Sequence, residues 1–243
     1  MVIIRLSKSK VNDFLHCRRC FKYRYIDNVQ SEPNEAMRLG TDVHAIAEEF
    51  VKNIDMDKDF YEQMDKIYQS YDTDFDLSKH LLNLSIFFDL LFHDEDTVGG
   101  YKIFSAEEYI HDKVHDFSGL ADLILEDEDG YLIVIDYKTG KSKSIKNYRL
   151  ELCYYKMLIE YAYPDKIVST AGIVFTKDAG TRFLNFRETQ SKGSYITQED
   201  YEAAISLIDF VRKEVDDNRL YPEPQYLCRY CSYQERCQEE GGM

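Results

Sequence analysis

Apolar residues follow a helical pattern in the first part of the chain and a strand pattern in the second. Up to about residue 97 they recur at every third or fourth position, as on one side of an amphipathic helix. After Gly99 and Gly100 they form short runs with polar connections, which is typical of strands. The pattern predicts helices at 7–17, 36–53, over much of 53–97, at 148–161, and from Thr197 onward. It predicts strands at 101–107, 117–125, 131–137 and 166–176.

The predicted strand at 131–137 contains an unbroken apolar run, Leu132-Ile133-Val134-Ile135. Such a run indicates a strand that is covered on both faces, so we expect helices on each side of the sheet. The chain is therefore expected to have an α/β fold and to form a single domain over residues 1–243. Residues 101–176 would form the sheet core, and residues 53–98 would form a helical lobe inserted before it.

Charge is distributed unevenly along a chain that is acidic as a whole. There are 30 Lys and Arg residues against 45 Asp and Glu residues, and the net charge of −15 disfavours a polyanionic partner. The predicted lobe is strongly acidic, whereas residues 8–24 and 138–149 are rich in lysine and arginine. These two basic stretches permit contact with nucleic acid phosphates, although a solvated charged surface would show the same pattern.

The chain lacks the apolar segments that direct a protein to a membrane. No apolar run approaches the roughly 20 residues that cross a bilayer, and the opening apolar stretch is too short for a signal peptide. We therefore expect no membrane partner and a cytoplasmic location. In that reducing compartment the six cysteines are expected to bind a metal or a cluster rather than to form disulfides.

Two of the predicted strands are joined by a short turn and carry two aspartates. Asp129-Gly130 is a strong hairpin-turn signal, and a short loop centred there places Asp122 opposite residue 135, 136 or 137. Facing carboxylates about 5 Å apart repel each other unless a cation lies between them, and oxygen ligands favour Mg²⁺ or Mn²⁺. Asp136 and Lys138 share a face because side chains alternate along a strand. This trio suits phosphodiester hydrolysis, with an exposed ion pair at a hairpin end as the alternative.

Three motifs occur in an order that resembles the PD-(D/E)XK nuclease superfamily, in its RecB-like branch. Gly40-Thr41-Asp42-Val43-His44 is similar to the G-x-x-x-H motif of that branch, Gly119 to Asp122 to its G-x-x-D motif, and Asp136-Tyr137-Lys138 to its catalytic core. The resemblance implies a restriction-endonuclease-like core, which is a mixed central sheet flanked by helices. It implies that Asp122, Asp136 and Lys138 are catalytic. It also implies a Mg²⁺ or Mn²⁺ site formed by His44, Asp122, Asp136 and the Tyr137 carbonyl.

Two further features match the branch in part. The branch has a Q-x-x-x-Y pattern on the helix after the catalytic strand, where this chain has Glu151 and Tyr155 on one helix face. Glu151 departs from the usual glutamine, and a carboxylate there would either repel a DNA phosphate or join the metal ligands. Glu107, or Glu108 beside it, occupies a position where the family often has an acidic residue, and an ordinary surface carboxylate is the alternative.

Five of the six cysteines lie near the chain ends, as Cys17-x2-Cys20 and Cys228-x2-Cys231-x5-Cys237. One interpretation joins the two C-x2-C pairs into a structural Zn²⁺ site, which leaves Cys237 unexplained. The other takes Cys17, Cys228, Cys231 and Cys237 as ligands of an iron-sulfur cluster, which leaves Cys20 as an extra residue.

The cluster interpretation is supported by a resemblance to the iron-staple nucleases, which include the CRISPR-associated exonuclease called Cas-four and the AddB nuclease domain. The opening Ser7-x-Ser9-x-Val11-x-x-Phe14-x-x-Cys17 and the ending Cys228-Arg229-Tyr230-Cys231 are similar to theirs, except that Arg18 replaces the usual proline after the cysteine. The resemblance implies a [4Fe-4S] cluster held by residues 1–25 and 220–243.

The resemblance further implies a Mg²⁺- or Mn²⁺-dependent exonuclease or endonuclease that acts on single-stranded DNA or DNA ends in CRISPR adaptation, with CRISPR integration proteins as partners. A DNA repair or viral recombination nuclease of the same branch is the nearest alternative. A catalytically weak DNA-binding or scaffold module, held together by zinc or a cluster, is the alternative from another class. Because the acidic lobe repels phosphate, we expect Arg18, Arg19, Lys141 and Lys143 to contact the DNA backbone.

Overall fold

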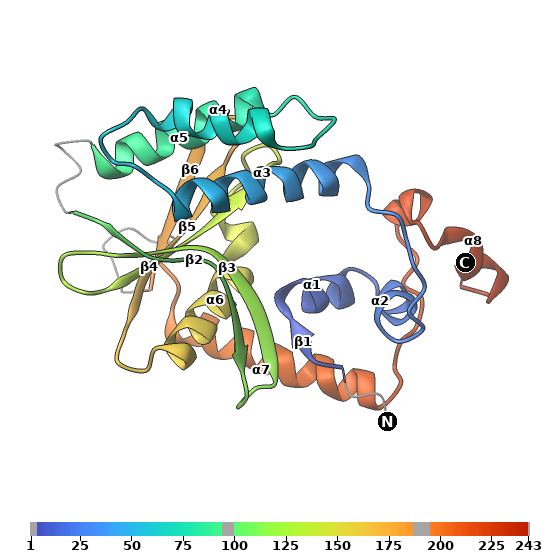
Figure 1. Ribbon diagram of the computed structural model, residues 1–243. Helices are drawn as coiled ribbons and strands as arrows, with labels where there is room; N and C mark the ends of the chain where they lie inside the picture. Colours follow the sequence, from blue (N-terminus) through green and yellow to red (C-terminus); the bar gives the residue numbers. More distant parts are fainter. Residues whose placement is uncertain (1–3, 94–99, 187–194, 243) are drawn as a thin grey trace.

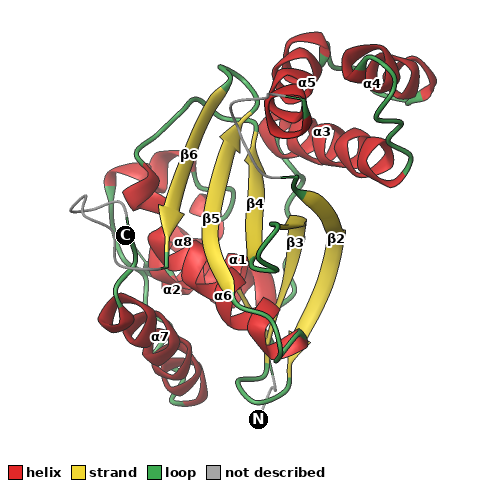
Figure 2. Cartoon of the chain, turned by 90° about the vertical axis from the view of Figure 1, so that its left-hand side faces the viewer, coloured by secondary structure: helices red, strands yellow, loops and turns green. Residues whose placement is uncertain are grey.

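A six-stranded mixed sheet lies between two groups of helices in the computed structural model, which describes residues 4–93, 100–186 and 195–242 (Figures 1 and 2). This arrangement agrees with the fold class expected from the sequence. The strands are β1 (Leu6–Ser7), β2 (Lys102–Asp112), β3 (Phe117–Glu126), β4 (Leu132–Lys138), β5 (Val168–Phe175) and β6 (Gly180–Asn185). The helices are α1 (Lys8–His16), α2 (Arg18–Tyr25), α3 (Glu35–Lys52), α4 (Phe60–Ser70), α5 (Ser78–Phe92), α6 (Arg149–Ala162), α7 (Gln198–Asp216) and α8 (Gln234–Glu239), with the short 3-10 helices η1 (Ile145–Tyr148) and η2 (Tyr226–Tyr230).

The strands follow the order β1-β3-β4-β5-β6 across the sheet, and β2 pairs with the other edge of β3. β3 and β4 form the expected antiparallel hairpin, after which α6 crosses back over the sheet so that β5 lies parallel to β4. A parallel pair needs such a crossover, because a tight turn joins only antiparallel strands. The crossover places α6 directly over the hairpin that carries the two aspartates.

Side chains of the hairpin alternate between two apolar cores, one on each face of the sheet. Ile124 and Val134 are fully buried in the core formed with α1, α6 and α7. Leu123 and Ile135 are buried in the opposite core, formed with α3, α4 and α5. The expectation that this apolar run is covered on both faces is confirmed, and full burial of each such side chain stabilises the fold by about 1.5–3 kcal/mol.

The acidic segment at 53–98 forms α4 and α5 as far as it is described, and both helices pack with α3. Phe60 and Met64 of α4 and Phe88 of α5 are fully buried in the same core as Ile135 of the sheet. Apolar side chains therefore attach this acidic segment to the sheet. Residues 94–98 of the predicted lobe lie outside the described residues.

The structure adds β1, α2, β6, α8 and the two 3-10 helices to the elements expected from the sequence, and β2 continues to Asp112 instead of ending at residue 107. β1 has two residues and exists only through its pairing with β3, far along the chain, so no local pattern marks it. α2 is mostly polar and buries Phe21 and Tyr23. The described part of the chain contains no helix with the length and hydrophobicity needed to cross a membrane.

One edge of β3 has two different partners, and the ladder is interrupted between them. β1 pairs in parallel with Phe117 and Ser118, whereas pairing with β4 begins only at Leu123. Helix α1 begins at Lys8, directly after β1. The start of α1 is therefore held beside the part of β3 that carries Asp122.

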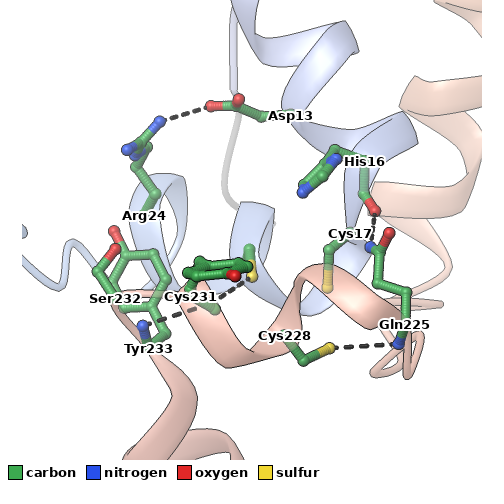
Figure 3. A pocket seen from close by; sticks show the side chains of 11 residues that line it. Asp13, His16, Cys17, Arg24, Gln225, Cys228, Cys231, Ser232 and Tyr233 are labelled. Atoms are coloured by element: carbon green, nitrogen blue, oxygen red, sulfur yellow. Dashed lines mark hydrogen bonds and ion pairs between the residues drawn. The ribbon is translucent and has the colours of Figure 1, made fainter. Parts of the chain in front are cut away.

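The two ends of the chain meet beyond the C-terminal end of α1. The Gln225 side-chain amide donates to the backbone carbonyl of His16 at 2.7 Å, and the Tyr23 hydroxyl donates to Glu240 at 2.8 Å. A cavity of 310 Å³ opens between the two ends, with cysteines from both of them in its wall (Figure 3). The cysteines that line it are Cys17, Cys20, Cys228 and Cys231.

Candidate functional site

The β3–β4 hairpin brings the two aspartates together, as its turn predicted. Leu123 pairs with Ile135, and this register places Asp122 opposite Asp136. The backbone ladder stops at this point, and the Tyr137 N–H donates instead to Asp122 Oδ2 at 2.7 Å. Asp122 is 6% exposed and Asp136 is 1% exposed. Two buried carboxylates thus lie beside each other at the end of the hairpin.

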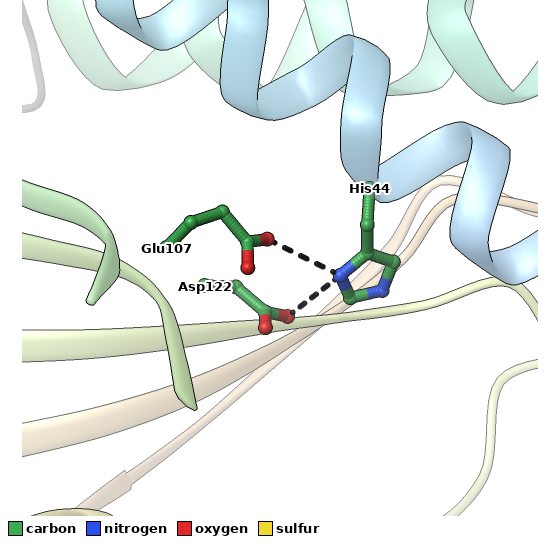
Figure 4. A group of neighbouring side chains, drawn as sticks. All are labelled: His44, Glu107 and Asp122. Atoms are coloured by element: carbon green, nitrogen blue, oxygen red, sulfur yellow. Dashed lines mark ion pairs between the residues drawn. The ribbon is translucent and has the colours of Figure 1, made fainter. Parts of the chain in front are cut away.

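His44, Glu107 and Asp122 converge from α3, β2 and β3 (Figure 4). One ligand atom from each residue lies within 4.8 Å of those of the other two, a spacing that allows them to share a metal ion. His44 Nδ1 lies 3.4 Å from Asp122 Oδ2 and 3.6 Å from Glu107 Oε1. His44 Nε2 lies 3.2 Å from the carbonyl oxygen of Tyr137. One ring nitrogen and several oxygens form a donor set that suits Mn²⁺ or Mg²⁺.

Glu107 shows two features that fit a metal ligand. Its φ of +48° lies in the left-handed region, which is unfavourable for a residue other than glycine by roughly 1 kcal/mol or more. Its Oε1 atom is buried and has no hydrogen-bond donor. A buried carboxylate oxygen without a donor is destabilising unless a cation binds it. The residues therefore fit a divalent cation, and of the two glutamates considered from the sequence it is Glu107 that points here, whereas Glu108 accepts from the Tyr163 hydroxyl.

An open cavity of 420 Å³ leads from the molecular surface to this group. Its lining includes Thr41, Glu48 and Leu120 in addition to His44 and Glu107. The carboxylates in its wall give it a negative potential, which attracts cations. The cavity therefore offers a divalent ion a direct path from solvent to His44 and Glu107.

His44 is protonated at neutral pH when no metal is bound. Burial lowers its pKa, but the Asp122 and Glu107 carboxylates outweigh burial and raise the pKa to about 10. A free histidine has a pKa of about 6.5, so these contacts stabilise the folded chain fully below that pH. The contribution is lost as the pH rises through about 10. Because a histidine must be neutral to bind a metal, the ion has to displace this proton.

We expect the affinity for Mn²⁺ to rise about tenfold per pH unit between about pH 6.5 and 8.5, because one proton leaves His44 for each ion bound. Calorimetric titration in buffers of different ionisation enthalpy measures the number of protons released. His44→Gln should bind Mn²⁺ more weakly and lose the pH dependence. His93→Gln, at the exposed end of α5, is the matched control. A wild-type affinity that does not change with pH would contradict the assignment.

Asp136 and Lys138 belong to a second buried group, which includes Glu151 and Tyr155 of α6. Lys138 Nζ lies 2.5 Å from Asp136 Oδ2 and 2.7 Å from Glu151 Oε1. The Tyr155 hydroxyl donates to Asp136 Oδ1. Burial raises the pKa of Asp136, but Lys8 and Lys138 outweigh burial and hold that pKa below its usual range. Asp136 is therefore a carboxylate at neutral pH despite its burial.

Lys8 is the member of this group that sequence reasoning missed. Lys8 Nζ lies 3.0 Å from Asp136 Oδ1 and 2.6 Å from Glu151 Oε1. Burial lowers the pKa of Lys8, but the carboxylates raise it by more, so the ammonium group stays charged. Its position beside Ser7, the N-cap of α1, was visible in the sequence. No spacing rule connects that position to a hairpin 128 residues later.

The two groups meet at β4, whose consecutive residues face different partners. The Tyr137 carbonyl lies beside His44, and Asp136 lies against the lysines. Of the ligands expected from the sequence, His44, Asp122 and the Tyr137 carbonyl lie together, with Glu107 added. Asp136 is next to them but is paired with Lys8 and Lys138. A cation-binding group and a lysine–carboxylate group therefore adjoin, which suits hydrolysis of a phosphodiester.

Comparison with known proteins defines the family. A model described as the PD-(D/E)XK nuclease superfamily matches residues 5–238. The chain belongs to this superfamily. Among solved structures, it is similar to a protein from Eubacterium rectale described as “Putative exonuclease”, with a TM-score of 0.50 and 12% sequence identity, over 95% of this chain and 87% of that chain. At this identity the likeness supports the fold alone. A search of curated proteins finds no match.

The PD-(D/E)XK fold of this chain has a structural reason for the glycine that precedes Asp122. A Cβ atom at Gly119 would lie 2.5 Å from Leu158 Cδ1 of α6. Real Cβ atoms do not approach so closely, so a larger residue would force the buried Leu158 side chain to change its position. Gly119 therefore lies at a close packing contact between β3 and α6, the helix that carries Glu151 and Tyr155.

All five terminal cysteines of this PD-(D/E)XK chain line one narrow cavity. Cys20 Sγ lies 3.3 Å from Cys231 Sγ, and a hydrogen bond with Cys20 lowers the pKa of Cys17. Thiols from both ends of the chain therefore face one space. Both ligand sets expected from the sequence lie in this group. Its members are Cys17, Cys20, Cys228, Cys231 and Cys237.

The basic residues expected to contact DNA lie in two different settings. Arg18 and Arg19 form ion pairs at 2.6 and 3.1 Å with glutamates in the C-terminal part of the chain. Lys141 and Lys143 are exposed in the loop that follows β4 and Lys138. A phosphate contact by either arginine would have to break an ion pair. The two lysines need no such rearrangement and lie directly downstream of the candidate active site.

Proposed function

We propose that the protein is a Mg²⁺- or Mn²⁺-dependent deoxyribonuclease of the RecB-like branch, which hydrolyses single-stranded DNA or DNA ends. One observation carries the proposal: His44, Glu107 and Asp122 meet the Asp136–Lys138 pair at the end of one hairpin. Membership of the PD-(D/E)XK nuclease superfamily supports it.

The metal-binding residues and Lys138 have separate roles in this proposal. His44, Glu107, Asp122 and the Tyr137 carbonyl hold the divalent ion, which when bound lowers the pKa of a coordinated water and polarises a phosphoryl oxygen. Lys138 has a side chain that is 27% exposed, so its ammonium group can reach a phosphate in the site. It offsets the negative charge that develops on the scissile phosphate.

A [4Fe-4S] cluster bound by Cys17, Cys228, Cys231 and Cys237 joins the two chain ends in this proposal. The convergence of these thiols on one cavity supports it. A Zn²⁺ ion bound by the two C-x2-C pairs is the second candidate, because the short Cys20–Cys231 contact favours it.

The biological role that we propose is the trimming of DNA in CRISPR adaptation, in the cytoplasm and together with CRISPR integration proteins. The support is the likeness of the opening and ending cysteine segments to the Cas-four nucleases. Repair or viral recombination by a nuclease of the same branch is the alternative, and the genes beside this one distinguish the two.

Anaerobically purified protein incubated with labelled linear and circular single-stranded DNA tests the activity. With Mn²⁺ we expect cleavage of the linear strand and none when EDTA replaces the metal. Cleavage of the circle as well would assign an endonuclease. A linear duplex is incubated in parallel. The proposal is wrong if the linear strand, the circular strand and the ends of the duplex all stay intact with Mn²⁺ or Mg²⁺.

Lys141 and Lys143 are expected to hold the DNA backbone. The double variant Lys141→Ala, Lys143→Ala should bind single-stranded DNA more weakly and lower the salt dependence of binding. The slope of log K against log salt should fall by about 0.7 for each phosphate that the variant no longer neutralises. Fluorescence anisotropy in EDTA, which prevents cleavage, measures this slope at several salt concentrations.

The matched control is Lys52→Ala, Lys58→Ala, which removes two exposed lysines beside the acidic segment. These lysines pair with neighbouring acidic residues, so binding and slope should not change. The same slope in wild type and in the Lys141, Lys143 variant would show that this loop is only solvated.

A further inference from the structure

Lys8 reaches the group of Asp136, Lys138, Glu151 and Tyr155 from outside the hairpin and helix α6 that supply these four residues. Its side chain is 19% exposed, and Nζ reaches Asp136 Oδ1 at 3.0 Å and Glu151 Oε1 at 2.6 Å. The ammonium group also lies 4.5 Å from the centre of the Tyr155 ring, within range of a cation–π contact. Because this charged lysine is mostly buried, its contacts are part of the tertiary structure and differ from an exposed surface ion pair.

The charges in this group balance only when both lysines are counted. Asp136 and Glu151 supply two carboxylates, and Lys8 and Lys138 supply two ammonium groups. Both ammonium groups meet the same atom, Glu151 Oε1, at 2.6 Å from Lys8 and 2.7 Å from Lys138. A buried carboxylate without a cation is strongly destabilising. One lysine must therefore remain with Glu151 whenever the other turns to a substrate.

We propose that Lys8 is the lysine that stays with Glu151 and that it thereby leaves Lys138 free to act on the scissile phosphate. In this assignment Lys8 is a positioning residue, because it acts through Glu151 and Lys138 and does not contact DNA. The inference rests on the proposed nuclease function and assigns within it a role to a residue outside the family motifs.

The backbones of both lysines are held by strand pairing, but their side chains differ in exposure. β1 pairs with β3 directly before Lys8, and the Ser7 side chain caps α1 by accepting from the backbone N–H of Lys10. These backbone anchors hold Lys8 in place independently of its ion pairs. Lys138 pairs with Phe175 of β5 as the last residue of β4, and it is followed by the loop with the exposed lysines. Its side chain is 27% exposed against 19% for Lys8, so Lys138 is the cation more open to a substrate.

A double-mutant cycle with Lys8→Met and Glu151→Gln tests the assignment. Lys8→Met leaves Lys138 as the single cation for two carboxylates, so kcat for DNA cleavage with Mn²⁺ should fall about 30-fold, while KM changes less than about threefold. Glu151→Gln removes the carboxylate that needs a cation and should lower kcat less than about fivefold. The double variant should recover to within about fivefold of the wild type, because both the charge and its partner are gone.

Lys10→Met is the matched control. Lys10 lies on the same helix, but its ammonium group donates to the carbonyl of Arg5 outside the site, so kcat should stay at the wild-type value. Thermal unfolding of each variant separates loss of activity from loss of fold. If Lys8→Met is too unstable to assay, the comparison of Glu151→Gln with the double variant still decides. Those two should agree within about threefold, because the role assigned to Lys8 acts through the Glu151 carboxylate and Lys138 still pairs with Asp136 in both variants.

Two outcomes overturn the inference alone: Lys8→Met with the wild-type kcat, or a double variant at least as slow as Lys8→Met. In both, the wild type still cleaves DNA and the proposed function stands. A wild type that does not cleave with Mn²⁺ or Mg²⁺ overturns the proposed function and the role of Lys8 together.

Discussion

Asp136→Asn is expected to lower the rate of DNA cleavage by about a thousandfold or more and to leave the fold intact. Asp136 is the carboxylate at which the metal-binding group and the lysines meet. The amide keeps the shape of the side chain and the acceptor for the Tyr155 hydroxyl, but it removes the negative charge that aligns Lys8 and Lys138. Both asparagine and alanine leave two buried ammonium groups with one carboxylate, but alanine would also leave a cavity and remove the acceptor, so asparagine separates catalysis from stability more cleanly.

Single-turnover cleavage of a linear single strand with Mn²⁺ measures the loss, and circular dichroism and the thermal midpoint confirm the fold. Lys138→Met should show a comparable loss. Asp122→Asn should lose Mn²⁺ affinity in calorimetry as well as activity, because Asp122 belongs to the metal-binding group. Asp129→Asn, at the exposed turn of the same hairpin, is the control and should cleave at the wild-type rate. Cleavage by Asp136→Asn at a rate near that of the wild type would remove the catalytic assignment.

The part of the site that lies on the hairpin could be predicted because its signals are local. Asp129-Gly130 specifies the turn, the turn limits the register, and the register found places Asp122 opposite Asp136. Helix starts at Ser7 and Thr197 were also readable, since both side chains cap the backbone of the residues that follow. In these segments a few neighbouring residues determine the geometry.

The remainder depends on contacts between distant segments. Lys8 reaches Asp136 because β1 pairs with β3, and a strand of two residues has no pattern of its own. Glu107 could not be separated from Glu108 in the sequence, because strict alternation along β2 is broken by the left-handed conformation at Glu107. The ion pairs of Arg18 and Arg19 with the C-terminal part of the chain were likewise invisible. Such features follow from tertiary structure and not from local preference.

Helix α1 connects the cysteine group to the candidate active site. Cys17 is the C-cap of this helix and Lys8 is its first residue, so one rigid element of nine residues joins the two places. A metal or cluster that holds Cys17 therefore also restrains the position of Lys8. Loss of that centre is expected to lower the cleavage rate in addition to stability.

Cys237→Ser is expected to lose the iron-sulfur cluster, whereas Cys20→Ser and Cys153→Ala keep it. The proposed cluster needs Cys17, Cys228, Cys231 and Cys237. Cys153 is buried in α6, away from the other cysteines. Because the centre joins segments from both ends of the chain, its loss frees a very large loop and should lower the thermal midpoint by about 10 °C or more. Iron analysis and the visible absorption of anaerobically purified protein measure the cluster directly.

The zinc interpretation predicts the reverse pattern in the same two variants. A site built from the two C-x2-C pairs needs Cys20, which lies 3.3 Å from Cys231, and has no use for Cys237. Suppose that the protein is colourless and holds one zinc per chain, and that this zinc is kept in Cys237→Ser and lost in Cys20→Ser. The zinc interpretation would then be correct and the cluster interpretation wrong. Since both centres would hold Cys17, the variant that loses its centre should also cleave DNA more slowly, and Cys153→Ala should not. Comparing the metal content and the cleavage rate of these variants therefore tests whether a centre bound at Cys17 restrains Lys8 through α1.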